Sequence, residues 1–162
     1  MRYLLDTNVF IAAKNQHYGM DFCPGFWDWL VGANQAGVVY SVENVLDEIK
    51  NGNDELKDWA IKIGRAFFLQ RDARVITAAQ NVSSWASSQG YTQDAIQKFF
   101  SSADYWLISY ALAYGDTVVT HERRQDGAKK RILIPNVCIG LGVSYTTPYE
   151  MLRREKARFV MA

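Results

Sequence analysis

The chain has 162 residues, a formal net charge of +1 and 49% hydrophobic residues. This length is enough for one domain with a substantial core, and this composition argues against a disordered chain. No apolar run is long enough to cross a bilayer and no signal peptide is apparent, so we expect one cytoplasmic domain over residues 1–162, with no membrane partner.

The chain opens on a short apolar run, Tyr3-Leu4-Leu5, which ends in the polar triplet Asp6-Thr7-Asn8. A continuous apolar run is typical of a strand buried on both faces of a parallel sheet. The triplet then lies at the carboxyl end of the strand, where open α/β sheets bind their ligands. We expect Asn8 or Thr7 to cap a helix over residues 9–14 and Asp6 to face the crevice. The alternative is that Asp6 only caps this helix.

Helices and strands then alternate along the chain. Helical periodicity predicts helices over residues 24–36, 42–51, 53–65, 72–88, 92–100 and 147–156. A short helix that starts at residue 134 is expected to end at Gly140 or Gly142, and a further helix contains Asp104 and ends at Gly115. Short strands are predicted at residues 38–40, 67–69, 117–120 and 143–145. The alternation predicts an α/β fold of three layers, with a mostly parallel central sheet between two layers of helices.

Three acidic side chains lie on the helix predicted over residues 42–51, which Ser41 is expected to cap. Asp47 points away from the apolar face of this helix and is expected to face solvent. Glu43 and Glu48 flank the apolar face on either side, so either of them is a candidate for the crevice.

Asp104 shares the buried face of its own helix, because apolar residues follow it at i+3, i+4, i+7 and i+8. It also occupies the first helical turn, where the helix dipole favours an anion. The strand over residues 117–120 ends in His121-Glu122, which adds an acid at the carboxyl edge of the sheet. Asp116 precedes this strand and should lie at the opposite edge.

Acids that meet in one crevice need a counter-charge, because several neighbouring carboxylates cannot all be ionised without one. The two cysteines and two histidines lack the spacing of a zinc site, so oxygen atoms would hold any metal ion. Mg²⁺ prefers such ligands and binds together with substrate phosphates. A basic run follows Glu122 and could contact those phosphates: Arg123, Arg124, Lys129, Lys130 and Arg131. The pattern therefore favours phosphodiester hydrolysis.

Four motifs, in this order, resemble those of the PIN-domain family of metal-dependent ribonucleases, which includes the VapC-like toxins of bacterial toxin–antitoxin pairs. The motifs are Leu5-Asp6-Thr7-Asn8, Val45-Leu46-Asp47-Glu48-Ile49, Ala103-Asp104-Tyr105-Trp106-Leu107-Ile108 and Val118-Val119-Thr120-His121-Glu122. The resemblance implies that Asp6, Glu48 and Asp104 are catalytic, metal-binding acids, and it selects Glu48 over Glu43. Asn8 and Thr120 match supporting polar positions.

The same resemblance implies a PIN-like fold and an endoribonuclease that uses Mg²⁺ or Mn²⁺. RNA would be the substrate, a separate antitoxin protein the partner, and a homodimer the assembly. One motif departs from the family pattern, in which Asp or Asn commonly follows the threonine. Here His121 follows Thr120. We expect Glu122 to supply the fourth catalytic, metal-binding acid, as in a longer branch of the family.

Two other functions have to be weighed against the nuclease. A phosphatase of the aspartyl-phosphate type would use Asp6 as nucleophile, but Asn8 stands where such enzymes carry a second acid. A non-catalytic protein-binding module could use the aromatic residues Phe26, Trp27 and Trp29, yet it would not need to retain four acids.

Overall fold

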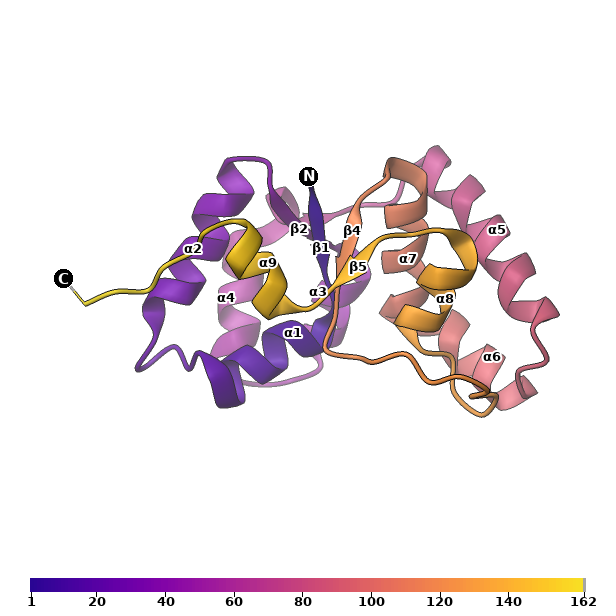
Figure 1. Ribbon diagram of the computed structural model, residues 1–162. Helices are drawn as coiled ribbons and strands as arrows, with labels where there is room; N and C mark the ends of the chain where they lie inside the picture. The colour runs from indigo at the N-terminus through magenta and orange to yellow at the C-terminus, as the bar shows by residue number, and fades with distance from the viewer. Residues whose placement is uncertain (162) are drawn as a thin grey trace.

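The computed structural model describes residues 1–161, and Figure 1 shows a sheet that lies between two groups of helices. Within residues 1–161 the sheet has the strand order β3-β2-β1-β4-β5, and all neighbouring strands are parallel. The strands are β1 (Tyr3–Leu5), β2 (Val39–Val42), β3 (Phe68–Leu69), β4 (Thr117–Val119) and β5 (Tyr145–Thr146). The carboxyl ends of β1 and β4 therefore lie side by side at one edge of the sheet.

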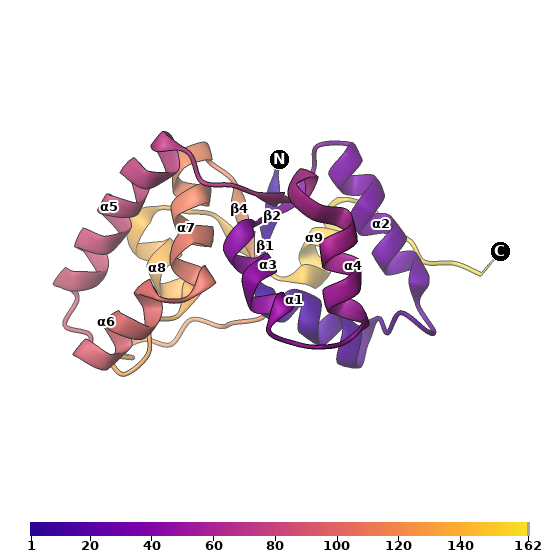
Figure 2. The same cartoon turned by 180° about the vertical axis from the view of Figure 1, so that it is seen from behind.

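The helices are α1 (Thr7–Ala12), α2 (Pro24–Gln35), α3 (Glu43–Lys50), α4 (Glu55–Ile63), α5 (Ala73–Ser88), α6 (Gln93–Phe100), α7 (Ala103–Tyr114), α8 (Ile134–Leu141) and α9 (Pro148–Arg154). Helix α7 packs on β1, β2 and β4, with α5, α6 and α8 around it. Helices α2, α4 and α9 lie on the opposite side of the sheet (Figures 1 and 2). The three-layer α/β/α architecture predicted from the sequence is thereby confirmed. None of the helices in the described part of the chain combines the length and the apolar content that crossing a bilayer requires.

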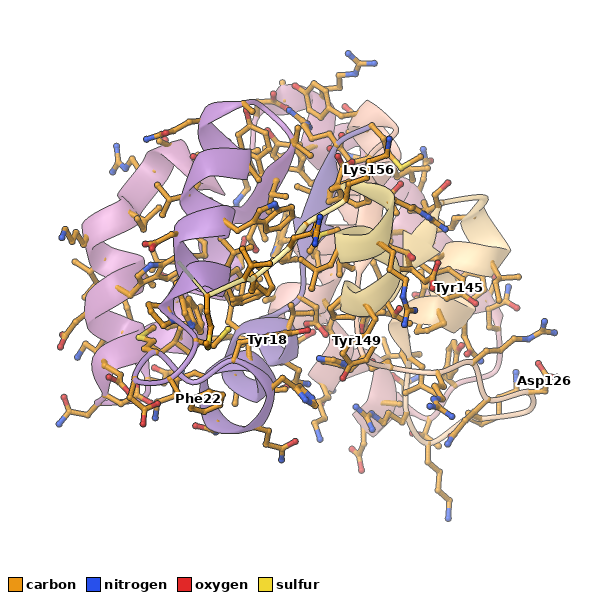
Figure 3. The ribbon with its side chains drawn as sticks, turned by 60° about the vertical axis from the view of Figure 1, so that its left-hand side comes forward. Tyr18, Phe22, Asp126, Tyr145, Tyr149 and Lys156 are labelled. Carbon is orange, nitrogen blue, oxygen red and sulfur yellow. The ribbon has the colours of Figure 1, made fainter. Side chains whose placement is uncertain are left out.

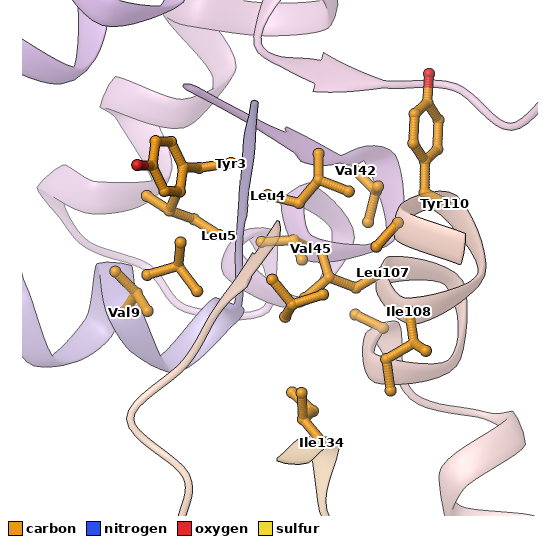
Figure 4. Close-up of a cluster of buried hydrophobic side chains, with 14 of the residues drawn as sticks. Tyr3, Leu4, Leu5, Val9, Val42, Val45, Leu107, Ile108, Tyr110 and Ile134 are labelled. Carbon is orange, nitrogen blue, oxygen red and sulfur yellow. The ribbon is translucent and has the colours of Figure 1, made fainter. Parts of the chain in front are cut away.

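Strand β1 occupies the centre of the sheet, and its side chains are buried on both faces. Tyr3 and Leu5 point toward Val9 on one side, whereas Leu4 points toward Leu107 on α7 (Figure 4). The apolar run at the start of the chain is continuous rather than alternating because both faces are covered by helices.

Several predicted helix ends are confirmed by their hydrogen bonds. The side chains of Asp72, Thr92 and Thr147 accept hydrogen bonds from backbone N–H groups in the first turns of α5, α6 and α9. Gly115 ends α7 with a left-handed backbone at φ 72°.

The prediction that Ser41 caps a helix is wrong. Strand β2 continues through Val42, and the buried Ser41 hydroxyl donates a hydrogen bond of 2.6 Å to the carbonyl oxygen of Leu5. The hydroxyl is satisfied by the neighbouring strand, so it does not contact the helix that follows. Other predicted boundaries also shift by one or two residues; for example, α4 begins after Asp54 and β5 lies at Tyr145–Thr146.

Asp116 lies at the amino end of β4, opposite the candidate crevice, as expected. Arg2 donates two hydrogen bonds to its carboxylate, from Nε at 2.8 Å and from Nη2 at 2.7 Å. The Arg2 guanidinium also lies over the rings of Tyr40, Tyr110 and Tyr114. Asp116 is only 5% exposed, and its charge is fully matched by this partner.

Candidate active site at the carboxyl edge of the sheet

Asp6 follows β1 directly and is 2% exposed. Leu5 pairs with Val119 across the two strands, so Asp6 comes to lie beside Thr120. The Thr120 hydroxyl donates a hydrogen bond of 3.1 Å to Oδ2 of Asp6. The strand register therefore holds this carboxylate at the edge of the sheet.

The prediction that Asn8 or Thr7 caps the first helix is wrong. Asp6 occupies the N-cap position of α1, although its side chain makes no capping hydrogen bond. Thr7 lies in the first turn and is buried, and Asn8 is exposed. Thr7 does not cap the helix because its hydroxyl donates a hydrogen bond of 2.6 Å to Oε1 of Glu48.

Glu48 reaches the same region from α3. Its Oε2 accepts a hydrogen bond of 3.4 Å from the backbone N–H of Ala103, at the start of α7. Glu43 was the other candidate on this helix. Its Oε1 lies 3.4 Å from Nε of Arg71, so its side chain is directed toward that arginine. Asp47 is exposed, as expected. The structure thus directs Glu48, and not Glu43, toward the start of α7.

Asp104 lies in the first turn of α7, close enough to the other acids to be affected by their charge. Burial and then the charges of Asp6, Glu122 and Glu48 raise the pKa of Asp104 to about 8. Burial, followed by the charge of Glu122, likewise raises the pKa of Asp6 to about 7. The four acids named by the resemblance therefore lie near one another, and burial and the charges of Glu122 and Glu48 disfavour full ionisation of Asp6 and Asp104.

Glu122 completes the group from the segment after β4. Its backbone N–H donates to the Thr120 hydroxyl at 3.1 Å, so one hydroxyl connects Glu122 with Asp6. Burial raises the pKa of Glu122, and Arg131, whose Nη2 lies 3.8 Å from Oε1, opposes this shift. Oε2 of Glu122 is buried and has no hydrogen-bond partner among residues 1–161. A buried carboxylate oxygen without a donor is a position at which a cation would be stabilising.

The donor set fits a divalent cation that prefers oxygen. In their present positions no three His, Cys, Asp or Glu side chains within residues 1–161 are arranged to hold a metal ion. The chemistry nevertheless fits Mg²⁺ or Mn²⁺, because the group offers carboxylate oxygens, raised pKa values and one unpartnered buried oxygen. It does not fit zinc, since nitrogen and sulfur ligands are missing from the group.

The two histidine rings lie close to each other, and neither is part of the acid group. Their ring centroids are 5.6 Å apart, and Tyr149 contacts both rings. His17 ends a π-helical turn, Ala13–His17, that extends α1 and that the sequence did not predict. The His121 ring therefore packs against α1 and α9 through His17 and Tyr149.

The predicted RNA-binding run divides into two parts. Arg124 pairs with Asp126 inside the loop at 2.6 Å, and Lys129 donates a hydrogen bond of 2.7 Å to the carbonyl oxygen of Gln89 at the end of α5, so both are already engaged. Figure 3 shows this loop extending outward at Asp126. Arg123 and Lys130 are exposed.

Lys130 and Arg131 line a hollow of about 300 Å³ next to Asp104, which we call the basic pocket. A third cation, Lys98 on α6, lines the same pocket. Sequence reasoning missed Lys98, because a lysine in the last turn of a helix is ordinary and only the fold brings it to Asp104. The basic pocket is the part of the surface where cations and the acid group meet.

Comparison with solved structures shows that the fold is shared. A chain of the VapBC2 complex from Rickettsia felis, bound to a DNA fragment from their promoter, matches 91% of this chain and 98% of its own length. The TM-score is 0.57 and the sequence identity is 16%. This likeness extends over nearly the whole chain and concerns the α/β/α fold.

The sequence comparisons give the family. No curated protein sequence matches the chain. Residues 3–159 match the family described as "Domain of unknown function (DUF4411)", which is nearly the whole chain. The protein therefore belongs to the DUF4411 family.

Proposed function

We propose that this protein is a metal-dependent endoribonuclease and the toxin component of a toxin–antitoxin pair. One observation carries the proposal: Asp6, Glu48, Asp104 and Glu122 come from four separate segments, and burial, together with the charges of Glu122 and Glu48, raises the pKa values of Asp6 and Asp104 at the carboxyl edge of the sheet. Such a group costs stability unless it binds a cation, so its presence favours a functional site over a structural one. The likeness to a chain of a VapBC2 complex supports the toxin assignment.

In this proposal Asp6, Glu48, Asp104 and Glu122 hold Mg²⁺ or Mn²⁺. A divalent cation bound there would polarise a phosphodiester and lower the pKa of a nearby water molecule. Thr120 fixes Asp6 and Thr7 fixes Glu48, each through a hydroxyl that donates to the carboxylate. Asn8, which is exposed next to Asp6, would contact the substrate or a water molecule rather than the buried carboxylate.

The basic residues would bind the RNA backbone. Lys130 and Arg131 lie beside Asp104 and would attract phosphates, and Arg123 would extend this contact. Arg124 and Lys129 would support RNA binding only by fixing the conformation of the loop, because Arg124 already pairs with Asp126 and Lys129 already donates to Gln89. We further propose a cytoplasmic homodimer whose partner is a separate antitoxin protein.

The test is cleavage of RNA by purified protein, with and without EDTA, followed by mapping of the ends. We expect cleavage that requires Mg²⁺ or Mn²⁺ and leaves 5′-phosphate and 3′-hydroxyl ends. Asp104→Asn should lower the rate by roughly 100-fold or more, as expected for removal of a group that stabilises developing charge. Asp58→Asn makes the same chemical change at an exposed acid on α4 and should cleave like wild type.

Two results would contradict the proposal. Equal cleavage by Asp104→Asn and wild type would assign the activity to a contaminant. No cleavage of any RNA by folded wild-type protein, with Mn²⁺ present and no antitoxin bound, would favour the binding module. Trapping of a phosphorylated Asp6 would instead favour the phosphatase.

A further inference from the structure

A second hollow lies on the other side of the start of α7, and we call it the amide pocket. It has a volume of about 270 Å³ and is lined mainly by Asn44, Asp47, Glu48, Asn51 and Trp106. Ser102 lines both this pocket and the basic pocket. Asp104 borders one pocket and Glu48 borders the other, so the acid group lies between the two.

The two pockets differ in charge. Three cations line the basic pocket, whereas the amide pocket has two carboxylates and no cation among its lining residues. A phosphate would be repelled from the amide pocket and attracted to the basic pocket. The amide pocket therefore suits a neutral, polar group.

Its polar side chains are available for such a group. Asn44 is half-buried and Asn51 is exposed, and both line the pocket. Each amide offers a carbonyl oxygen that accepts and an NH₂ group that donates. Donors and acceptors of this kind recognise the edge of a nucleobase.

Trp106 provides an aromatic wall that is held in place. The guanidinium of Arg71 lies 3.9 Å from the centroid of its ring, and the same arginine pairs with Glu43. Tyr105 contacts the ring from another direction, with 4.9 Å between centroids. An indole held on two sides loses little freedom when a base contacts it, which favours binding.

We propose that the amide pocket binds a nucleobase of the substrate while the basic pocket binds a neighbouring backbone phosphate. The strand would then cross the acid group in one direction, with its base on the α3 side and its phosphate on the α6 side. The base has to be unstacked to enter the pocket, so it belongs to an unpaired part of the RNA. This inference rests on the proposed function and adds the residues that select the base: Asn44, Asn51 and Trp106.

The direct test uses nucleosides, because they carry a base and no phosphate. Adenosine, guanosine, cytidine and uridine are titrated separately into the full-length protein, and the indole N–H of Trp106 and the side-chain NH₂ groups are followed by NMR. At least one nucleoside should shift the Trp106 signal together with those of Asn44 and Asn51. Its affinity should exceed that of the weakest nucleoside by about tenfold, the discrimination that one good amide–base pair supplies.

Variants locate the binding. Asn51→Ala and Asn44→Ala should each lower the affinity for the preferred nucleoside by roughly tenfold. Asn81→Ala removes an exposed amide on α5 and should bind as wild type does. The inference is overturned if no nucleoside shifts the Trp106 signal, or if both Asn44→Ala and Asn51→Ala bind like wild type.

Cleavage mapping separates this inference from the proposed function. On RNA of random sequence, wild type should prefer one base at a fixed position beside the cut, and Asn51→Ala should lose that preference while its cleavage still requires metal. An unchanged preference in Asn51→Ala would overturn the base pocket and leave the nuclease in place. Nucleoside binding without any cleavage would overturn the nuclease and leave the pocket in place.

Discussion

The two ends of the central strands each bury an aspartate, and the two sites differ in what surrounds it. Asp116 at the amino end is 5% exposed and Asp6 at the carboxyl end is 2% exposed. Arg2 donates two hydrogen bonds to Asp116, which matches its charge with a fixed cation. Asp6 has a threonine hydroxyl as donor and acids as neighbours. Burial alone therefore does not separate a structural acid from a functional one; the counter-charge does.

The two aspartate sites should contribute to stability with opposite sign. A fold that buries a carboxylate paired with an arginine loses stability when either partner is removed. A fold that buries carboxylates that repel one another gains stability when one of these charges is removed. Removal of one charge should thus have opposite effects at the two ends of the sheet.

Arg2→Met should produce the largest change, because it removes the cation and leaves Asp116 buried with an unmatched charge. Methionine keeps an unbranched apolar side chain at this position but removes the guanidinium that lies over the tyrosine rings. We expect the free energy of unfolding to fall by roughly 3 kcal/mol. In a domain of this size, each kcal/mol lost lowers the Tm by about 2–4 °C. Thermal unfolding by circular dichroism measures this. Lys62→Met, at an exposed lysine on α4, is the matched control and should change little.

Asp6→Asn and Asp104→Asn should raise the Tm in EDTA at about pH 8, although both remove acids that we propose to be catalytic. An asparagine oxygen still accepts the Thr120 hydrogen bond, while the repulsion by Glu122 is lost. We expect a gain of about 2 kcal/mol, less than the pKa shift alone implies, since three acids remain. Asp58→Asn should leave the Tm near that of wild type. A lower Tm in both active-site variants would mean that the acids are structural.

The wild-type Tm in EDTA should fall as pH rises from about pH 5 to pH 8. An unfolded aspartate loses its proton near 3.8, whereas Asp6 keeps its proton until about 7 and Asp104 until about 8. The folded protein therefore binds more protons across this window, so stability decreases with pH. The facing charges are those of Glu48, Glu122 and Arg131. Asp104→Asn should flatten the curve, and a Tm that rises across this window contradicts the assignment.

Thr120→Val should have the smallest effect. The substitution preserves shape and removes the hydroxyl that connects Asp6 with the backbone of Glu122. Loss of such an orienting contact lowers metal affinity by about tenfold or more. A tenfold loss corresponds to about 1.4 kcal/mol of binding free energy. Thr120→Ser should restore the affinity measured by Mn²⁺ titration. If serine fails to restore it, the hydroxyl does not orient the acids.

Sequence patterns predicted helix and strand ends correctly where the deciding side chain contacts only residues close to it in sequence. Asp72 and Thr92 cap helices because each side chain bonds an N–H three residues later. The apolar run before Asp6 predicted a buried strand correctly, because a short, continuous apolar run is itself the pattern of a strand buried on both faces. Ser41 and Thr7 were misread as caps, because each hydroxyl bonds to a group about forty residues away, a distance that local rules do not cover.

The candidate site shows the same division. Periodicity placed Asp104 on the buried face of α7, but it left Glu43 and Glu48 equal, since both flank one helical face. The contacts that distinguish them come from Arg71 and from Thr7, which are distant in sequence. Lys98 carried no signal in the sequence, because its role depends on α6 lying beside Lys130 and Arg131.

We propose that the acids at the carboxyl edge of the sheet share a divalent cation. Isothermal titration of wild type, Asp104→Asn and Asp58→Asn with Mn²⁺, in the absence of RNA, measures this binding separately from cleavage. We predict saturable binding to wild type and to Asp58→Asn, and at least about tenfold weaker binding to Asp104→Asn. Equal Mn²⁺ affinity in all three proteins, or no binding to wild type, would contradict the account.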